Sequence, residues 1–217
     1  MTSIETTPRS GADTFARYAM IASAFLAPLS IAVSLFLAPY AVTAEGAAYV
    51  QNFVDNIGSY PLWAWWGAIF AILLIPGLFG VSSVARRGRA TLGFIGMILA
   101  FTLAIPSPGN SDDLIYAAAK SGVDVPTIAK MWDYELPTSA VGSLFFAGLL
   151  GLVLLGVAAL LGKTAPSWAS IVLIVAPFTV PVAWFAGLPN SIAAGAWVLM
   201  AIGMGGVSLG LLRQPSH

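Results

Sequence analysis

Residues 142–162 read GSLFFAGLLGLVLLGVAALLG, a run without a single charged side chain. A helix needs roughly 20 mainly apolar residues to cross the hydrocarbon core of a membrane, so this run is long enough for one crossing. Gly148, Gly151 and Gly156 recur within it. Small residues let neighbouring helices approach closely, so the stretch predicts a membrane-spanning helix that packs tightly against others.

Five further apolar runs of similar kind accompany this one along the chain. None of the six has Asp, Glu, Lys or Arg in its core, which argues against an ion pathway built on buried charge. Together they predict an all-α integral membrane helical bundle with six transmembrane helices, forming a single domain over residues 1–217. The predicted spans are residues 18–41, 62–84, 90–106, 138–162, 167–187 and 192–212.

The composition of the whole chain points to the same surroundings. Hydrophobic residues make up 59% of it and charged residues 8%, whereas about 25% of a soluble domain is charged. The expected partner is therefore the lipid bilayer, and the net charge of zero gives nucleic acid no electrostatic attraction. The chain has no cysteine and its single histidine is His217, so we expect no thiolate or histidine metal site, and no cofactor.

The charges in the connections predict an orientation. Seven of the nine Lys and Arg residues lie in the termini and in two tight turns, such as ARRGR at 85–89. Seven of the nine acids lie in the two long loops. By the positive-inside rule, both termini are cytoplasmic in a multi-pass protein of the cell membrane, and the long loops face outward.

The two long outer loops are predicted to be helical as well. Residues 44–57 place Ala48, Phe53 and Ile57 near one side of a helix. In residues 111–132, Ser111 is a suitable helix cap, and Gly122 with Pro126 would divide the loop into two short helices. We expect these helices to lie along the outer surface with their apolar sides toward the bundle.

Acids and aromatic rings alternate where the long loops meet the second and fourth spans. The two stretches are VDNIGSYPLWAWW at 54–66 and MWDYELP at 131–137. A carboxyl group against apolar surface has a raised pKa and can act as a general acid. Aromatic faces stabilise a nearby cation by about 0.5–2 kcal/mol per contact. The pattern predicts an aromatic pocket under the outer loops, suited to protonating an isoprenoid chain and cyclising it.

These two stretches, with the multi-helix plan lacking internal His and Cys, resemble the small integral-membrane terpene cyclases that act on prenylated, indole-type substrates. The resemblance implies a hydrophobic, isoprenoid-like small-molecule partner. It implies Asp133 as proton donor, Asp55 as its partner, and Glu135 and Glu45 as alternates. The residues expected to line the cation pocket are Trp132, Tyr134, Tyr60, Trp63, Trp66 and Trp184. The ionising step would be protonation, which needs no metal.

Two other functions are compatible with the same pattern. In a transporter or receptor, the pocket would bind an apolar or cationic small molecule without changing it. In a structural subunit, the Gly-rich faces would mediate assembly and the outer aromatic residues would be an interfacial belt with packing roles. The sequence does not fix the oligomeric state.

Two further features each allow a functional and a structural explanation. Asp112 and Asp113 could suggest a Mg²⁺-diphosphate site, but no basic cluster accompanies them, so a favourable charge effect at a helix start is the preferred interpretation. Pro177, Pro181 and Pro189 stand in or beside the fifth span. Proline kinks can open a cavity between helices, although such kinks are also common in ordinary membrane helices.

Overall fold

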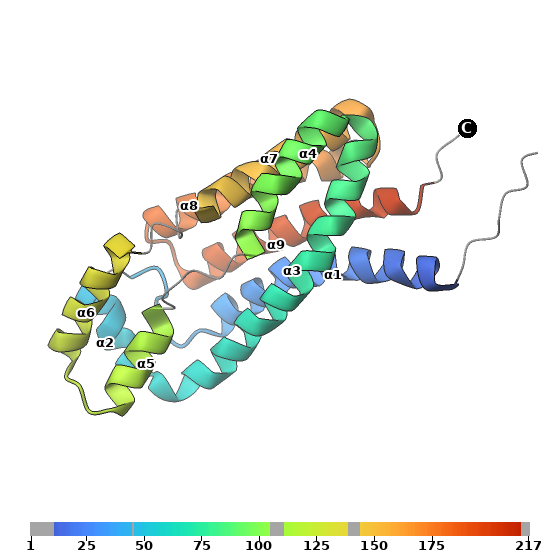
Figure 1. Cartoon of the computed structure of the whole chain (residues 1–217). Helices are drawn as coiled ribbons and strands as arrows, with labels where there is room; N and C mark the ends of the chain where they lie inside the picture. Colours follow the sequence, from blue (N-terminus) through green and yellow to red (C-terminus); the bar gives the residue numbers. More distant parts are fainter. Residues whose placement is uncertain (1–10, 45, 105–110, 139–143, 214–217) are drawn as a thin grey trace, which may run out of the picture.

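The computed structural model describes residues 11–44, 46–104, 111–138 and 144–213, except for the side chains at positions 111, 133 and 135–138. Over these residues the chain forms helices and no strand, which confirms the all-helical prediction. The long helices lie side by side in one bundle, and three short helices gather at one of its ends (Figure 1).

Among the described residues, five helices are long and apolar enough to cross a membrane, so the chain is a multi-pass membrane protein. Pro61 stands in the first turn of the second of them, where its missing N–H costs no hydrogen bond. The five are α1 (Gly11–Leu37), α3 (Tyr60–Gly88) preceded by η1 (Ile57–Ser59), α7 (Leu144–Gly162), α8 (Ser167–Phe185) and α9 (Asn190–Ser208) followed by η4 (Leu209–Leu211).

The bounds of the predicted spans differ from the observed helices, and the first, third and fourth spans show differences that matter for the fold. The first helix begins at Gly11 rather than at residue 18, because the polar residues before the apolar run also form helical turns. Residue 138 ends a separate helix, and α7, which corresponds to the fourth predicted span, begins at Leu144. The third predicted span forms α4 (Ala90–Ala100) and the 3₁₀ turn η2 (Phe101–Ala104), which together are shorter than a crossing helix.

The long helices and α4 form a closed ring. Helix α1 packs between α3 and α9, α8 lies between α9 and α7, and α4 packs against α7 and α3. The centre of the ring is filled by leucine side chains and many alanines, of which Leu78, Leu155 and Leu173 are fully buried. Because the core side chains are small, the helix backbones can lie close together.

Glycines on α7 set the closest of these approaches. A Cβ atom added at Gly162 would lie 2.0 Å from the Cα of Gly88, and one added at Gly151 would lie 2.2 Å from the backbone nitrogen of Ala100. No side chain fits at either distance. The glycines predicted to permit close packing therefore bring α7 into backbone contact with the end of α3 and with α4.

The three short helices form a unit that we call the cap. It consists of α2 (Gly46–Asp55), α5 (Ser111–Lys120) and α6 (Val125–Thr138), and it lies at one end of the bundle (Figure 1). Helices are therefore present in both long loops, and the predicted break falls at Gly122, whose φ is +82°. The cap has its own core, made of Val50, Phe53, Tyr60, Ile115, Ala118, Ile128 and Ala129.

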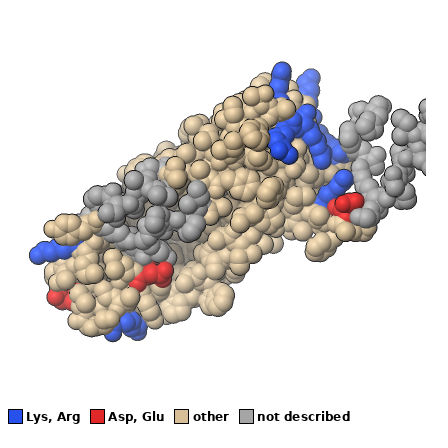
Figure 2. All heavy atoms as spheres, in the orientation of Figure 1, with Lys and Arg blue, Asp and Glu red and all other residues tan. Residues whose placement is uncertain are grey.

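Basic side chains gather at the end of the bundle away from the cap (Figure 2). Arg86 and Arg87 lie in the last turn of α3. Arg87 donates a hydrogen bond to the carbonyl of Gly210 (3.3 Å), and Arg17 donates one to the carbonyl of Leu211 (3.4 Å). The start of α1, the end of α3 and the end of α9 thus meet at this end, which we call the basic end.

The contact between α7 and α4 should fail when a side chain is placed at its closest point. Gly151→Ala sets a methyl group against the backbone of Ala100, and such overpacking typically costs about 1–3 kcal/mol. Gly195→Ala is the matched control, because Gly195 lies in a helix with nothing within 4 Å of its added Cβ. Thermal unfolding in detergent should show a lower Tm for Gly151→Ala alone. Equal Tm values for both variants would contradict the close contact.

Candidate functional site

Aromatic rings from five segments meet where the cap joins the bundle. Tyr40 stacks on Trp63 with ring centroids 5.9 Å apart, and Tyr49 stacks on Trp132 at 5.7 Å. Tyr60 lies 5.1 Å from Phe53 and 5.0 Å from Tyr116. This aromatic cluster comprises Tyr40, Tyr49, Phe53, Tyr60, Trp63, Tyr116 and Trp132.

Two carboxylates at the start of α5 bind phenols of this cluster. The hydroxyl of Tyr49 donates to Oδ1 of Asp112 (2.6 Å), and the hydroxyl of Tyr60 donates to Oδ1 of Asp113. Hydrogen bonds to charged acceptors are the stronger kind, so these contacts tie α5 to α2 and to the start of α3. Asp112 and Asp113 do stand in the first turn of a helix, as predicted, and they also act across the cap.

None of the predicted catalytic acids is placed in the aromatic cluster: one is exposed on α2, and the side chains of the other three lie outside the described residues. Asp55 is exposed at the end of α2, and its Oδ1 accepts a hydrogen bond from Nε2 of Gln51 (2.7 Å). Glu45 and the side chains of Asp133 and Glu135 lie outside the described residues. The predicted meeting of Asp55 with Asp133 therefore stays a prediction.

The predicted aromatic residues fall into three places. Tyr60, Trp63 and Trp132 belong to the aromatic cluster. Tyr134 is 81% exposed, and Trp66 is half-buried on α3, with an indole N–H that has no partner among the described residues. Trp184 stands apart from the others, at the end of α8, where it lines a hollow in the bundle. The predicted aromatic residues therefore lie in separate parts of the structure, and their joint role in one pocket stays a prediction.

Burial and negative charge raise the pKa of two phenols in the cluster. The pKa of Tyr40 rises to about 12, first because the ring is partly desolvated and then because the charge of Asp112 is close. The same two causes, with the hydrogen bond to Asp112, raise the pKa of Tyr49 further. Both phenols therefore remain protonated donors at neutral pH.

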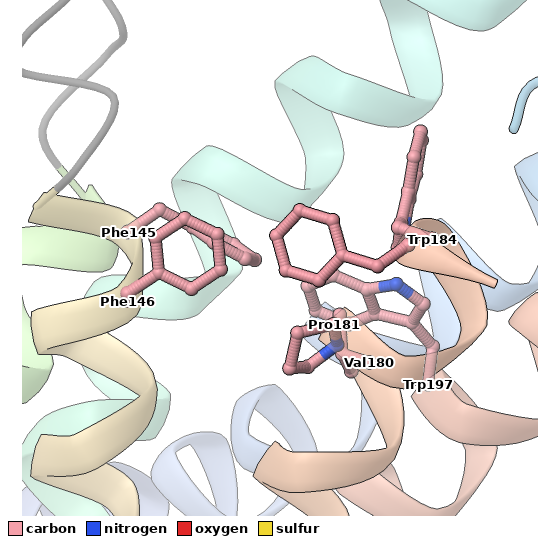
Figure 3. A pocket seen from close by; sticks show the side chains of 7 residues that line it. Phe145, Phe146, Val180, Pro181, Trp184 and Trp197 are labelled. Carbon is pink, nitrogen blue, oxygen red and sulfur yellow. The ribbon is translucent and has the colours of Figure 1, made fainter. Parts of the chain in front are cut away.

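A hollow in the described bundle lies between α7, α8 and α9. Its volume is about 360 Å³. Figure 3 shows Phe145 and Phe146 on one side and Trp184 on the other, with Val180, Pro181 and Trp197 also at its wall. The rings of Phe146 and Phe185 stack at 6.0 Å and join α7 to α8.

Trp197 on α9 forms the buried wall of this hollow. It is 7% exposed, and its ring packs edge-on against Phe70 at 5.7 Å and lies 6.4 Å from Phe145. Its indole N–H is buried without a partner in the described part of the chain. An unsatisfied donor costs about 1–3 kcal/mol, so the ring is held here by its packing.

A second hollow of about 150 Å³ continues the first along α7 and α8. The two share Phe146 and Pro181, so they adjoin, and we call them together the groove. The lining of the second hollow is completed by Leu149, Leu150, Val153, Pro177 and Phe178. Every side chain that lines the groove is apolar apart from the indole nitrogens of Trp184 and Trp197.

The closest backbone contacts of α7 are with different neighbours along its length. Near the cap end, Gly148 and Gly151 bring α7 against Leu103 and Ala100, on the side of α4 and η2. One turn further along, Gly156 brings α7 against Ile174 and Ser170 of α8. Pro177 and Pro181 lie in α8 beside the groove, and neither can donate a hydrogen bond to the carbonyl four residues earlier.

This arrangement suits binding of a molecule without polar groups. The groove offers aromatic faces and aliphatic walls, and its lining contains no ionisable side chain. Aromatic faces could also stabilise a cation, but a proton donor would have to come from outside the lining residues. The sequence signal for this site was the pair of prolines in the fifth predicted span, Pro177 and Pro181.

Comparison with known proteins assigns neither a family nor a function to this chain. The chain matches no protein-family model, no curated protein and no solved structure. Its function must therefore be argued from the cap and the groove themselves.

The phenol–carboxylate contacts should determine how firmly α5 is held. Tyr60→Phe removes the donor to Asp113 and should cost about 1–2 kcal/mol of local stability. Amide hydrogen exchange across residues 111–120 should then quicken by roughly fivefold to thirtyfold. Tyr134→Phe is the control, because that side chain is 81% exposed. Unchanged exchange in Tyr60→Phe would contradict the structural role of this contact.

The cap should also lose stability at alkaline pH. Unfolded phenols ionise near pH 10, whereas burial holds the pKa of Tyr40 at about 12 in the folded chain. The contribution of Tyr40 is therefore complete below pH 10 and is lost as the pH rises from 10 to 12. In Tyr40→Phe, the free energy of unfolding should fall less over this interval, as measured by denaturant titration followed by circular dichroism. An identical fall in both proteins would refute the assignment.

Proposed function

We propose that this protein binds an apolar, lipid-like or isoprenoid-like small molecule within the membrane, without transforming it. The observation that carries the proposal is the groove, an apolar hollow beside Trp184 and Trp197 on helices long enough to cross a bilayer. Sites for small molecules are typically concave and mostly apolar, which matches its lining.

The proposal includes a topology of six crossings with both termini in the cytoplasm of the cell. Two observations support it. Helix α4 packs beside α7 and α3 as part of the ring, so a full crossing would need only a few more residues beyond Ala104. The basic end brings the start of α1 and the end of α9 to the last turn of α3, which fits the positive-inside rule if this end lies on the cytoplasmic side. In this topology the cap and the open end of the groove are on the outer side.

A cyclase would need a proton donor in addition to the apolar groove, whereas a binding protein would not. A proton-initiated cyclisation needs an acid that reaches the bound chain. Asp112 and Asp113 accept hydrogen bonds from phenols of the aromatic cluster, and Asp55 is exposed to solvent. The proton would then come from Asp133, the predicted donor, or from its alternates Glu135 and Glu45, so Asp133 is the first residue to test.

Binding at the groove should depend on Phe185. Phe185→Ala removes an aromatic wall and about 1 kcal/mol of dispersion contacts, which corresponds to roughly a fivefold rise in Kd. Saturable quenching of tryptophan fluorescence by a brominated prenyl alcohol, with the protein in nanodiscs, measures this, since Trp184 and Trp197 line the hollow. Phe36→Ala is the matched control, because Phe36 is exposed to a similar degree (69% against 75%) and lies outside the groove.

Two outcomes would count against the proposal. Quenching that does not saturate, or an equal effect of both substitutions, would show that the probe merely dissolves in the lipid. Conversion of a prenylated indole to a cyclised isomer, lost in Asp133→Asn, would establish an enzyme instead.

A further inference from the structure

The groove runs parallel to the helices that form it. Its wide hollow is lined by Phe145 and Phe146 at the start of α7 and by residues 180–185 at the end of α8. Its narrow hollow reaches Val153 on α7 and Pro177 on α8. From Phe145 to Val153 this is a length of about 12 Å along the helix axis.

One end of the groove is closed at the middle of the bundle. A Cβ added at Gly156 would lie 2.9 Å from Cγ1 of Ile174 and 3.1 Å from the carbonyl oxygen of Ser170, so α7 and α8 are in contact there. Val153 is near the midpoint of α7, which spans Leu144–Gly162. Half of a bilayer's hydrocarbon core is roughly 15 Å thick, so the groove has about the depth of one leaflet.

The other end opens near the polar surface beside the cap. Trp184 is 39% exposed there, and tryptophan favours the membrane interface. The turn that follows α8 carries polar contacts: Thr43 donates to the carbonyl of Leu188 (3.0 Å), and the amide of Asn190 bridges Tyr40 and Val42. A molecule in the groove can therefore have a polar group at this end and hydrocarbon below it.

We infer that the groove holds one acyl chain of a membrane phospholipid from the leaflet on the cap side, with its ester end near Trp184 and its tail near Val153. The inference rests on the proposed function and names its ligand. Three observations carry it: the depth of one leaflet, the taper from about 360 Å³ to about 150 Å³, and the apolar walls. A slender chain fits the narrow hollow, and the walls place no polar partner where a ring substituent would need one.

Photo-crosslinking can test the depth and direction of this chain. Phosphatidylcholines with a diazirine near the ester or near the chain terminus are placed in nanodiscs with the protein, and the labelled residues are identified by mass spectrometry. The first probe should label residues 181–185, and the second should label residues 149–153 and 177–178. Labelling in the groove should exceed that of Phe36 and Phe79, which are exposed outside it, by at least threefold.

A substitution that fills the narrow hollow provides the matched control. Leu150→Trp should reduce labelling by the terminal diazirine at least threefold, whereas Leu161→Trp on the same helix should not. The two leucines are similarly exposed (50% and 55%), and Leu150 alone lines the groove. Leu150→Ala leaves the hollow open and should retain the labelling, so a folding defect in the tryptophan variant is distinguishable.

The outcomes separate this inference from the proposed function. Labelling no stronger than at Phe36 and Phe79, or independent of diazirine depth, would overturn the inference. If the brominated prenyl alcohol binds saturably and displaces no phospholipid label, the groove binds an apolar molecule but not an acyl chain. Absence of saturable binding by either probe would refute both.

Discussion

Direct backbone contact between α7 and its neighbours determines the shape of the bundle. In a membrane, the lipid is as apolar as the helix surface, so close packing rather than hydrophobic burial holds helices together. Helix α7 meets α4 at Gly151, α8 at Gly156 and the end of α3 at Gly88. The groove lies beside the part of α7 whose glycines contact α4 and η2.

The cap is held by a different set of forces. Its three helices share a small core, and rings of the aromatic cluster join that core to the loop after α1 and to α3 through Tyr40 and Trp63. Asp112 and Asp113 then bind phenols from α2 and α3. A short helix is marginal alone, because each one fixes many torsions for few internal bonds. These side-chain contacts between helices distant in sequence are what order the cap.

Sequence patterns predicted most of the helices, but they did not predict which side chains from distant segments contact each other. Long apolar runs predict helices because a crossing has a fixed length, and Pro61 marks a helix start for local reasons. The prolines of the fifth span signalled a possible cavity, and Pro177 and Pro181 do line the groove. Asp112 and Asp113 seemed to be ordinary helix-start charges, since the tyrosines they bind are 63 and 53 residues away in the chain. No spacing rule reveals a contact of that range. Trp197 was missed as a lining residue for the same reason, because its position at the hollow depends on how α7, α8 and α9 pack together.

The stacked rings of Phe146 and Phe185 join the two helices at the wide hollow. They are 47% and 75% exposed, and each ring has two side-chain torsions with room to turn toward the lipid. Exposed side chains change rotamer within picoseconds to nanoseconds, far faster than helices separate. Rotation of these two rings would widen the lateral opening of the hollow without separating α7 from α8. For the proposed ligand, exchange with the bilayer would then depend on its fit to the walls and would not require the bundle to open.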